Sequence, residues 1–492
     1  MLFRSKEKQQ NAPFVTALEE YCKKNFFAYH TPGHKLGQGI SAYQKKLFGS
    51  ALARDLGLMY ALDDLFDPTG PLGEAMELAA DLYGAGRTCF SVNGTTACIE
   101  AMILAVCGEG DELIISREVH KSVMNGLILS GAKPVYMKSR FAFDEQISLG
   151  PDLAELKRVI AAHPAARAVL FTYPTYDGVC VDLTVLADYA HEQGLVVLVD
   201  EAHGAHFGMH PGLPSSALSC GADCVAQSTH KLAGSLTQTS MLHCRRGFAL
   251  TDKVVEAMSF VQSTSPHYWF LASLDSARQQ MALEGHGLLE RTLTLAAALR
   301  RKLNEIPGIV SFGKDILAKY GGLGGFDETK ICIDFSGLGL TGAQAERLLR
   351  QEKIEAELTA GNHVLVLITL GDTVESVAAL YEACLKISTI CSEAEQNGAV
   401  AEIPLPEPVV RLSPRQAWQG ETQLVPLEQA IGRIAAEPVL FYPPGIPVLA
   451  PGEEVTEACA VYIRKKTSEG YGAHGCADKT GKALRVIKRR EK

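Results

Sequence analysis

Two residues of this 492-residue chain could together serve the chemistry of one cofactor. Lys231 directly follows His230, and Asp200 ends the apolar run 195–199. Pyridoxal 5′-phosphate (PLP) needs a lysine that holds its aldehyde as a Schiff base and a carboxylate that keeps its pyridine nitrogen protonated. A surface lysine and a strand-end aspartate that caps the next helix are the structural alternatives. The pair predicts PLP as the cofactor.

A glycine and two threonines precede a predicted apolar helix and could bind the phosphate of such a cofactor. Gly94 would let the backbone approach an anion closely, and the amides at a helix start attract it. Thr95 and Thr96 can donate hydrogen bonds to phosphate oxygens, although an ordinary helix cap is the preferred interpretation of this motif when it is taken alone. Ser228 and His230, which neighbour the lysine, are close enough in sequence to hold the same phosphate.

Two histidines are added to the candidate catalytic residues, Lys231 and Asp200. His120 follows a predicted strand and precedes a helix, so its imidazole could lie flat on the cofactor ring. His203 comes shortly after Asp200 and either faces the same crevice or caps the chain locally. Because a lone histidine is more often a satisfied structural residue, both assignments depend on the rest of the set.

Short apolar runs alternate with helical patterns between residues 85 and 250. This alternation predicts a mainly parallel sheet covered on both faces. Ligands of such sheets collect at the carboxyl ends of the strands, where Asp200 lies. The predicted strands are 112–115, 134–137, 168–171, 195–199, 224–226 and 241–243. The predicted helices are 122–129, 152–162 and 183–192, the last with Asp182 as its N-cap.

The length of the chain predicts two or three domains. The segment 1–60 is too polar to form a core alone, and we expect it to wrap another domain or a partner subunit. A long helix is predicted over 275–303. The strand-helix-strand pattern over 330–370 indicates a small α/β domain, and the proline-spaced stretch 404–408 predicts a linker before a further segment.

Composition and charge argue against several classes of protein. The net charge of −9 disfavours a nucleic-acid partner. The sequence has no secretory signal and no apolar run as long as a membrane span, so we expect no membrane association and a cytoplasmic location. The 13 cysteines are scattered without a CxxC pair, which favours reduced core thiols. We predict no metal site.

The combined motifs resemble the fold-type I PLP enzymes and, more narrowly, the ornithine/lysine/arginine decarboxylase family. The resemblance covers nearly the whole chain, and its combination of motifs is specific. The chain resembles a short form that lacks an amino-terminal response-regulator-like domain, so the decamers of the longer members are not assumed. The motifs are Tyr29-His30-Thr31-Pro32-Gly33-His34-Lys35, Asp67-Pro68-Thr69-Gly70-Pro71-Leu72, Asn93-Gly94-Thr95-Thr96, Asp200-Glu201-Ala202-His203-Gly204, Ser228-Thr229-His230-Lys231, Thr264-Ser265-Pro266, Pro444-Gly445-Ile446-Pro447 and Pro451-Gly452-Glu453.

This resemblance implies the α/β fold of an aspartate aminotransferase-like, PLP-dependent transferase. It implies a PLP-binding major domain over 61–300, a small α/β domain over 301–400 and an α+β carboxyl-terminal domain over 401–492. By the resemblance, Lys231 is the Schiff-base lysine and Asp200 the pyridinium partner, and the ring lies between His120 and Ala202. Ser265 would reach the phosphate of a neighbouring subunit in a homodimer or a higher homo-oligomer. The implied phosphate ligands are Thr95, Thr96, Ser228 and His230.

The implied activity is decarboxylation of arginine, lysine or ornithine to an amine and CO2, within polyamine metabolism. Glu453 and Glu454 are candidates to recognise a basic substrate side chain, although solvated turn residues are the preferred interpretation of both. An aminotransferase or oxoamine synthase of the same fold is an alternative, because those enzymes share the Asp-Glu-Ala-His run and a nearby lysine. A non-catalytic PLP-binding protein is the alternative from another class.

Overall fold

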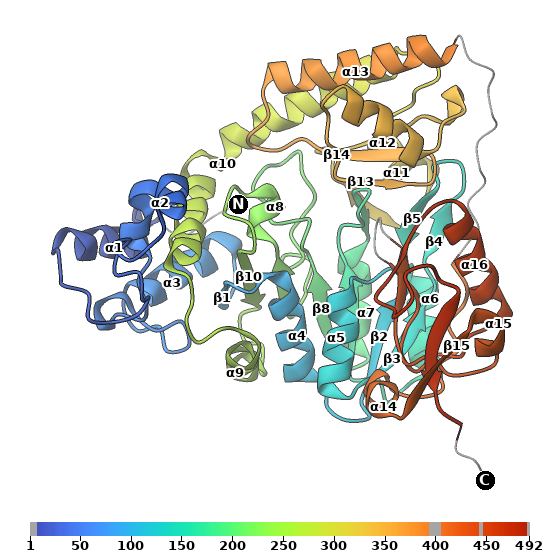
Figure 1. Ribbon diagram of the computed structural model, residues 1–492, viewed down its shortest axis with the longest axis horizontal. Coiled ribbons are helices and arrows are strands. Elements are labelled where there is room, and N and C mark those ends of the chain that lie inside the picture. The colour runs from blue at the N-terminus through green and yellow to red at the C-terminus, as the bar shows by residue number, and fades with distance from the viewer. Residues whose placement is uncertain (1–6, 393–404, 442–445, 490–492) are drawn as a thin grey trace. The chain divides into compact units, whose positions relative to one another are not determined.

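The computed structural model describes residues 7–392, 405–441 and 446–489 (Figure 1). Pro404 of the predicted linker and Pro444-Gly445 of the carboxyl-terminal motif lie outside these residues. The chain forms two compact units. The first unit comprises Met1–Ala105, Leu198–Pro211 and Ser215–Leu289, and the second comprises Val106–Val197, Gly212–Pro214 and Glu290–Lys492. The division of the chain into four segments stays a prediction.

Four neighbouring strands form the sheet of the first unit, in the order β1-β10-β9-β8. β8 and β9 run parallel, whereas β10 is antiparallel to both β9 and β1. Almost every residue of these strands is buried, as expected for a sheet that is covered on both faces. The strands are β1 Arg87–Ser91, β8 Val196–Asp200, β9 Cys224–Gln227 and β10 Ser240–Cys244.

Helices begin close to these strand ends and carry the candidate site residues. The apolar helix predicted after Thr96, over 97–106, is α4, which begins three residues earlier at Gly94. The lysine lies in a short helix, α8, that begins two residues after β9. The predicted long helix is α10, which starts earlier than expected because Leu271 and Leu274 extend its buried face. The helices are α3 Pro71–Tyr83, α4 Gly94–Val106, α8 Thr229–Leu232, α9 Thr251–Val261 and α10 Tyr268–Leu303.

The amino-terminal segment is fixed to α10 by a buried ion pair. Arg278 and Asp275 lie one helical turn apart, are fully buried, and are joined by a 2.6 Å hydrogen bond from Nη2 to Oδ1. Arg278 also donates to the backbone oxygen of Gln9, and Asp275 accepts from the amide of Phe14 at the start of α1 (Pro13–Lys23). These contacts satisfy both buried charges. They attach the segment to the first unit, although the segment has no core of its own.

The second unit contains the parallel strands β6, β2 and β3 in that order. Asp152 and Asp182 cap two of its helices, and their side chains accept from the amides of Glu155 and Val185. The strands are β2 Glu112–Ser116, β3 Lys133–Met137, β6 Ala168–Thr172, and the smaller β4 Arg140–Ala142, β5 Ile147–Gly150 and β7 Val179–Val181. The helices are α5 Lys121–Ser130, α6 Leu153–Ala162 and α7 Leu183–Glu192.

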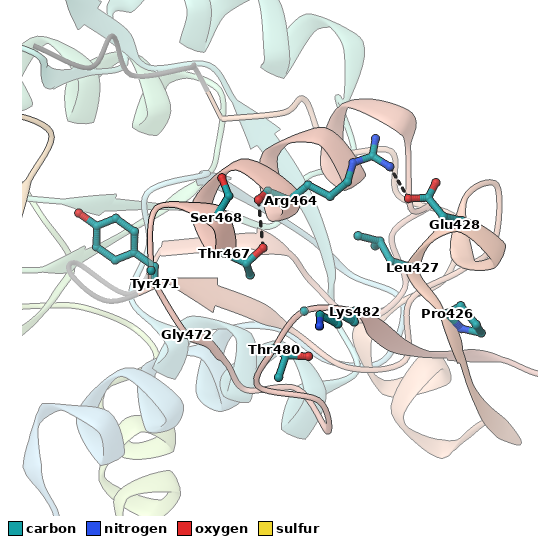
Figure 2. Close-up of a pocket in the computed structure, with 12 residues that line it drawn as sticks. Pro426, Leu427, Glu428, Arg464, Thr467, Ser468, Tyr471, Gly472, Thr480 and Lys482 are labelled. Carbon is teal, nitrogen blue, oxygen red and sulfur yellow. Dashed lines mark hydrogen bonds and ion pairs between the residues drawn. The ribbon is translucent and has the colours of Figure 1, made fainter. Parts of the chain in front are cut away.

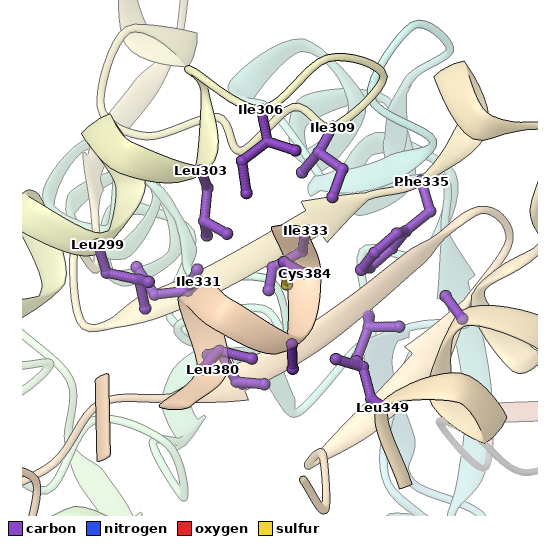
Figure 3. Close-up of a cluster of buried hydrophobic side chains, with 14 of the residues drawn as sticks. Leu299, Leu303, Ile306, Ile309, Ile331, Ile333, Phe335, Leu349, Leu380 and Cys384 are labelled. Atoms are coloured by element: carbon purple, nitrogen blue, oxygen red, sulfur yellow. The ribbon is translucent and has the colours of Figure 1, made fainter. Parts of the chain in front are cut away.

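The predicted strand-helix-strand region forms an antiparallel sheet, with the order β12-β14-β13, packed against helices. One apolar cluster joins β12 and β14 to the end of α10, with α12 and α13 beside them (Figure 3). Leu299, Ile331, Ile333, Leu349 and Leu380 are among its buried members. The elements are β11 Leu323–Phe326, β12 Lys330–Asp334, β13 Leu358–Ala360, β14 His363–Leu367, α11 Ile316–Lys319, α12 Gly342–Gln351 and α13 Val374–Ser392.

The carboxyl-terminal segment has the predicted α+β character. β15 pairs with β19, and β16 lies between β17 and β18, all in antiparallel pairs around a separate apolar cluster. The strands are β15 Thr422–Pro426, β16 Val439–Phe441, β17 Ile446–Leu449, β18 Ala473–His474 and β19 Ala483–Ile487. The helices are α14 Pro414–Gln419, α15 Leu427–Ala430 and α16 Glu457–Ser468.

A buried ion pair joins this segment to the loop that follows β2. Arg117 donates from both terminal nitrogens to Glu453, at 2.5 and 2.9 Å, and the two side chains are only 8% and 2% exposed. The amide of Ala450 donates to the same carboxylate. Arg117 lies three residues before His120, so the pair fixes the base of the loop that carries this histidine.

Replacing Glu453 with glutamine should destabilise the protein strongly. Arg117 would stay buried without a counter-charge, which costs about 3–5 kcal/mol. The neighbouring Glu454→Gln is a matched control, because Glu454 pairs with Arg411 at a partly exposed surface, where an ion pair contributes about 1 kcal/mol or less. Urea unfolding followed by circular dichroism measures both. Equal losses in the two variants would contradict the assigned role of the buried pair.

Two further expectations from the sequence concern the cysteines and a membrane span. No disulfide joins any of the 13 cysteines, all of which the structure describes, and ten of them are buried, so most lie in the core as predicted; their reduced state stays a prediction. Among the described residues, no helix combines the length and the apolar character needed to cross a membrane.

Candidate functional site

Lys231 and His203 are brought together at the carboxyl ends of the first unit's parallel strands. The lysine Nζ lies 2.8 Å from the histidine Nε2, a hydrogen-bond distance. Both are carried by short connections: His203 follows β8, and Lys231 lies in α8 after β9. The sequence left open whether His203 faces the crevice or caps the chain. The contact shows that it faces the lysine, where it can exchange a proton with Nζ.

Asp200 is the last residue of β8 and is only 5% exposed. Burial raises the pKa of its carboxyl group above the usual value, while the positive charge of Lys231 opposes this rise. Its Oδ1 accepts a hydrogen bond from the amide of Ala202 at 3.1 Å. A buried carboxylate is stable when a cation pairs with it, so the position suits a pyridinium N–H.

A cluster of hydroxyl groups lies at the start of α4. The Oγ1 atom of Thr95 is 2.5 Å from Ser228 Oγ and 2.7 Å from Ser240 Oγ. The fold therefore joins two of the predicted phosphate ligands, which are separated by 133 residues. Ser240 was not predicted. It is the first residue of β10 and lies directly opposite Ser91 of β1, so only the strand pairing shows that it is close to Thr95.

The backbone at the start of α4 has the conformation that the glycine was predicted to allow. Gly94 has φ +76°, a left-handed value that strains other residues, and an added Cβ would meet no atom closer than 3.9 Å. Open space and the following helix amides suit an anion there. Thr96, next in the chain, is half-buried. His230 lies beside the lysine, with its Nδ1 2.7 Å from the backbone oxygen of Thr239.

Two further candidates belong to other parts of the chain. His120 lies in the second unit as the N-cap of α5, where its side chain accepts from the amide of Ser122. Its stacking on a cofactor ring stays a prediction. Ser265 is exposed between α9 and α10, and its amide donates to Ser263 Oγ. Its reach toward a partner's phosphate stays a prediction as well.

A buried chain of hydrogen bonds links β9, β10 and β1 to the residue that follows β8, next to the candidate site. Gln227 Nε2 donates to Glu201 Oε2 at 2.7 Å, and Gln227 Oε1 lies 3.0 Å from His243 Nε2. The other ring nitrogen of His243 is 2.8 Å from Thr88 Oγ1. Burial raises the pKa of Glu201 to about 8 and lowers that of His243 to about 3.

The low pKa of His243 predicts a loss of stability in acid. As the pH falls, the unfolded chain binds a proton on this histidine near pH 6.5, whereas the folded chain does so only near pH 3. The free energy of unfolding therefore drops by about 1.4 kcal/mol per pH unit within this window. His243→Gln removes this contribution. Urea titrations should show the stability advantage of the unsubstituted protein over the variant shrinking by about 2 kcal/mol between pH 6.5 and 5. A constant difference would contradict the assignment.

One of the two carboxyl-terminal glutamates, Glu453, differs from the prediction made for it. Glu453 is buried against Arg117, so the preferred interpretation of a solvated turn residue was wrong for it; its partner lies 336 residues away. With both oxygens bonded to Arg117, Glu453 is committed to structure and not to a substrate side chain. Glu454 is partly exposed and pairs with Arg411.

A pocket of 590 Å³ lies within the carboxyl-terminal segment (Figure 2). None of the predicted site residues lines it. Arg464, which borders it, is bonded to Glu428 and Glu457. The lining residues are Pro426, Leu427, Glu428, Arg464, Thr467, Ser468, Gly470, Tyr471, Gly472, Thr480, Gly481 and Lys482.

The groups gathered around Lys231 fit PLP. The set contains an amine for the aldehyde, a buried carboxylate for the ring nitrogen, and clustered hydroxyls beside an open glycine for the phosphate. The donors are oxygen and nitrogen groups on rigid strand ends and helix starts, which can hold a planar, anionic cofactor in one orientation.

Comparison with known proteins agrees with this chemistry. Residues 12–321 match the family model described as "Orn/Lys/Arg decarboxylase, major domain", and residues 395–469 match its carboxyl-terminal domain. The chain is 42% identical to proteins named arginine decarboxylase from Bacillus anthracis and Bacillus subtilis, with 98% of each chain covered. It is 28% identical to a lysine decarboxylase of Pseudomonas aeruginosa, over 91% of this chain and 74% of that protein.

Solved structures confirm the predicted fold class. A lysine decarboxylase of Francisella novicida superposes with a TM-score of 0.85 at 22% identity, covering 97% of this chain and 81% of that one. A serine palmitoyltransferase of Sphingomonas wittichii gives a TM-score of 0.54 at 14% identity, over 80% of this chain and 87% of that one.

Proposed function

Because the chain belongs to the Orn/Lys/Arg decarboxylase family, we propose that it converts arginine to the corresponding amine and CO2. Membership of this family confirms three predictions: the resemblance itself, the enzyme class of a PLP-dependent amino acid decarboxylase, and the cofactor. The choice of arginine is supported by the names of the relatives that are 38–42% identical over nearly the whole chain. The amine product is a chemically suitable precursor for polyamines.

Each residue near Lys231 has a task in this reaction. PLP, when bound, supplies the electron sink that lets the bond between Cα and the carboxylate break. Lys231 would hold the cofactor aldehyde, and His203 can hold or move a proton at the lysine Nζ from 2.8 Å. Asp200 would pair with the positive charge of the ring nitrogen. Thr95, Ser228 and Ser240 would hold the phosphate.

We further propose that the protein works as a homodimer or a higher homo-oligomer. Support comes from aromatic side chains of the amino-terminal segment that the first unit leaves uncovered: Phe27, Tyr29, Tyr43 and Tyr60 are 90%, 95%, 76% and 107% exposed. Exposed apolar side chains that form a contiguous patch mark protein interfaces, and these four are candidates for such a patch. The free thiols are consistent with a reducing, cytoplasmic location.

A substrate panel tests the proposed activity. Purified holoenzyme is incubated separately with arginine, lysine and ornithine, each labelled in the carboxylate, and the released CO2 and the amine are quantified. We expect arginine to have the highest kcat/KM. The Lys231→Ala protein gives the background. Faster turnover of lysine or ornithine would overturn the choice of substrate, and a keto acid in place of CO2 would indicate an aminotransferase.

A further inference from the structure

Three potential metal ligands from distant parts of the second unit meet at one point. Asp177 lies in the loop between β6 and β7, Cys332 in β12 and His363 in β14. Cys332 and His363 are separated from Asp177 by 155 and 186 residues. None of these residues belongs to the PLP site described above, and no metal-binding sequence motif contains them.

The ligand atoms have the spacing of a metal site. His363 Nε2 is 3.1 Å from Asp177 Oδ1, Cys332 Sγ is 3.8 Å from the same oxygen, and all three ligand atoms lie within 4.8 Å of one another. Tetrahedral zinc has Zn–S bonds of about 2.3 Å and Zn–N or Zn–O bonds of about 2.0–2.2 Å, which separate neighbouring ligand atoms by roughly 3.3–3.7 Å. We propose that Asp177, Cys332 and His363 bind one Zn²⁺ ion.

Strand pairing holds two of the ligands on one face of the small sheet. Asp334 lies opposite His363 in the antiparallel pair of β12 and β14, and Cys332 lies opposite Leu365. Residues two apart in a strand point to the same side, so Cys332 and His363 are diagonal neighbours. The cysteine is fully buried, and the histidine side chain is 2% exposed.

A glycine brings the third ligand against this face. Gly178 has φ +97°, and an added Cβ would lie 3.2 Å from the backbone oxygen of Asp327 and 3.3 Å from Lys330 Cβ. The amide of Asp327 donates to the oxygen of Gly178 at 2.8 Å. The backbone next to Asp177 is therefore pressed onto β12. Asp177 is 14% exposed, so a water molecule on its side can complete four-fold coordination.

The donor set suits zinc in particular. Thiolate, imidazole and carboxylate are the ligands that this borderline-soft ion prefers. One thiolate and one carboxylate balance the two positive charges of the ion, which makes the metal-bound cluster neutral in a buried place.

Metal titration of the holoenzyme tests the site. Protein stripped with a chelator is dialysed against Zn²⁺, and bound metal is counted by atomic emission; Co²⁺ replaces zinc in a parallel sample. We expect one zinc per chain, visible absorption bands typical of tetrahedral cobalt, and a higher unfolding temperature with metal. Cys332→Ala should lose all three. Cys384→Ala is the control, because this thiol is equally buried in the same unit but lies in the cluster of α13.

Two results would overturn the proposal. Zinc binding that is unchanged in Cys332→Ala would place the metal elsewhere. A chelator-treated wild-type protein that takes up no zinc would leave Asp177, Cys332 and His363 as a hydrogen-bonded cluster only. If Cys332→Ala does not fold, as judged by circular dichroism, Asp177→Asn replaces it, because this change keeps the side-chain size and removes the charged ligand.

Discussion

Lys231→Ala is expected to abolish turnover while the fold is kept. The substitution removes the amine proposed to bind the cofactor aldehyde, and kcat should fall on the order of 10⁴-fold or more, as expected when a covalent catalyst is lost. The lysine is half-buried in the short helix α8, so truncating it leaves no large cavity. Release of CO2 from arginine and the absorption spectrum of the bound cofactor are the measurements.

The matched control for this experiment is Lys253→Ala. Lys253 is an exposed lysine on α9 in the same unit, and its loss should leave both activity and spectrum unchanged. Circular dichroism of the two variants should agree, because neither side chain belongs to the core. If Lys231→Ala keeps more than a small fraction of the wild-type rate, another lysine binds the cofactor and the site assignment is wrong.

Asp200→Asn should slow the reaction severely without releasing the cofactor. Asparagine has the same shape, but it lacks the negative charge that keeps a ring nitrogen protonated in a buried site. Loss of one such electrostatic contact typically costs about 10²–10³-fold in kcat. The fold should be unaffected, because burial of an uncharged side chain removes a desolvation cost. Measured kcat and cofactor content together test this expectation.

Asp252→Asn is the control for charge removal. Asp252 is exposed at the start of α9 in the same unit, and it lies outside the site. We expect its kcat to equal that of the wild type. A near-normal rate in Asp200→Asn would contradict the role of this carboxylate as the partner of the ring. Loss of the cofactor along with the rate would instead make it an anchoring residue.

Local patterns predict most elements of this fold well. Helix α7 begins and ends where its apolar pattern does, and Asp182 caps it as expected from its residue type. Strand β1 was missed, because its polar residues Arg87 and Thr88 break the apolar run that marks its neighbours. It is nevertheless buried, since long-range pairing with β10 supplies partners such as His243 for Thr88. When the burial of a strand depends on such distant partners, the local sequence pattern does not indicate that the strand is buried.

In the candidate site too, residues in local motifs could be predicted, whereas residues placed by long-range contacts could not. Lys231, Asp200 and Thr95 were predicted because each stands in a short motif at a strand end or helix start. Ser240 was missed, since nothing in its neighbourhood indicates that it lies beside Thr95. Glu453 was misjudged because Pro451-Gly452 is a turn signal that usually means exposure. An arginine 336 residues away in the sequence buries this glutamate.

Chemical trapping of the cofactor link is the most direct test of the central claim, that residue 231 holds PLP. Active enzyme is treated with borohydride, which reduces a carbon–nitrogen double bond to a stable single bond, and is then digested and mapped by mass spectrometry. We predict a pyridoxyl phosphate adduct on the peptide that contains Lys231, in amounts that follow the activity lost. An unmodified Lys231 peptide from fully inactivated enzyme, or an adduct on a different lysine, would contradict the claim.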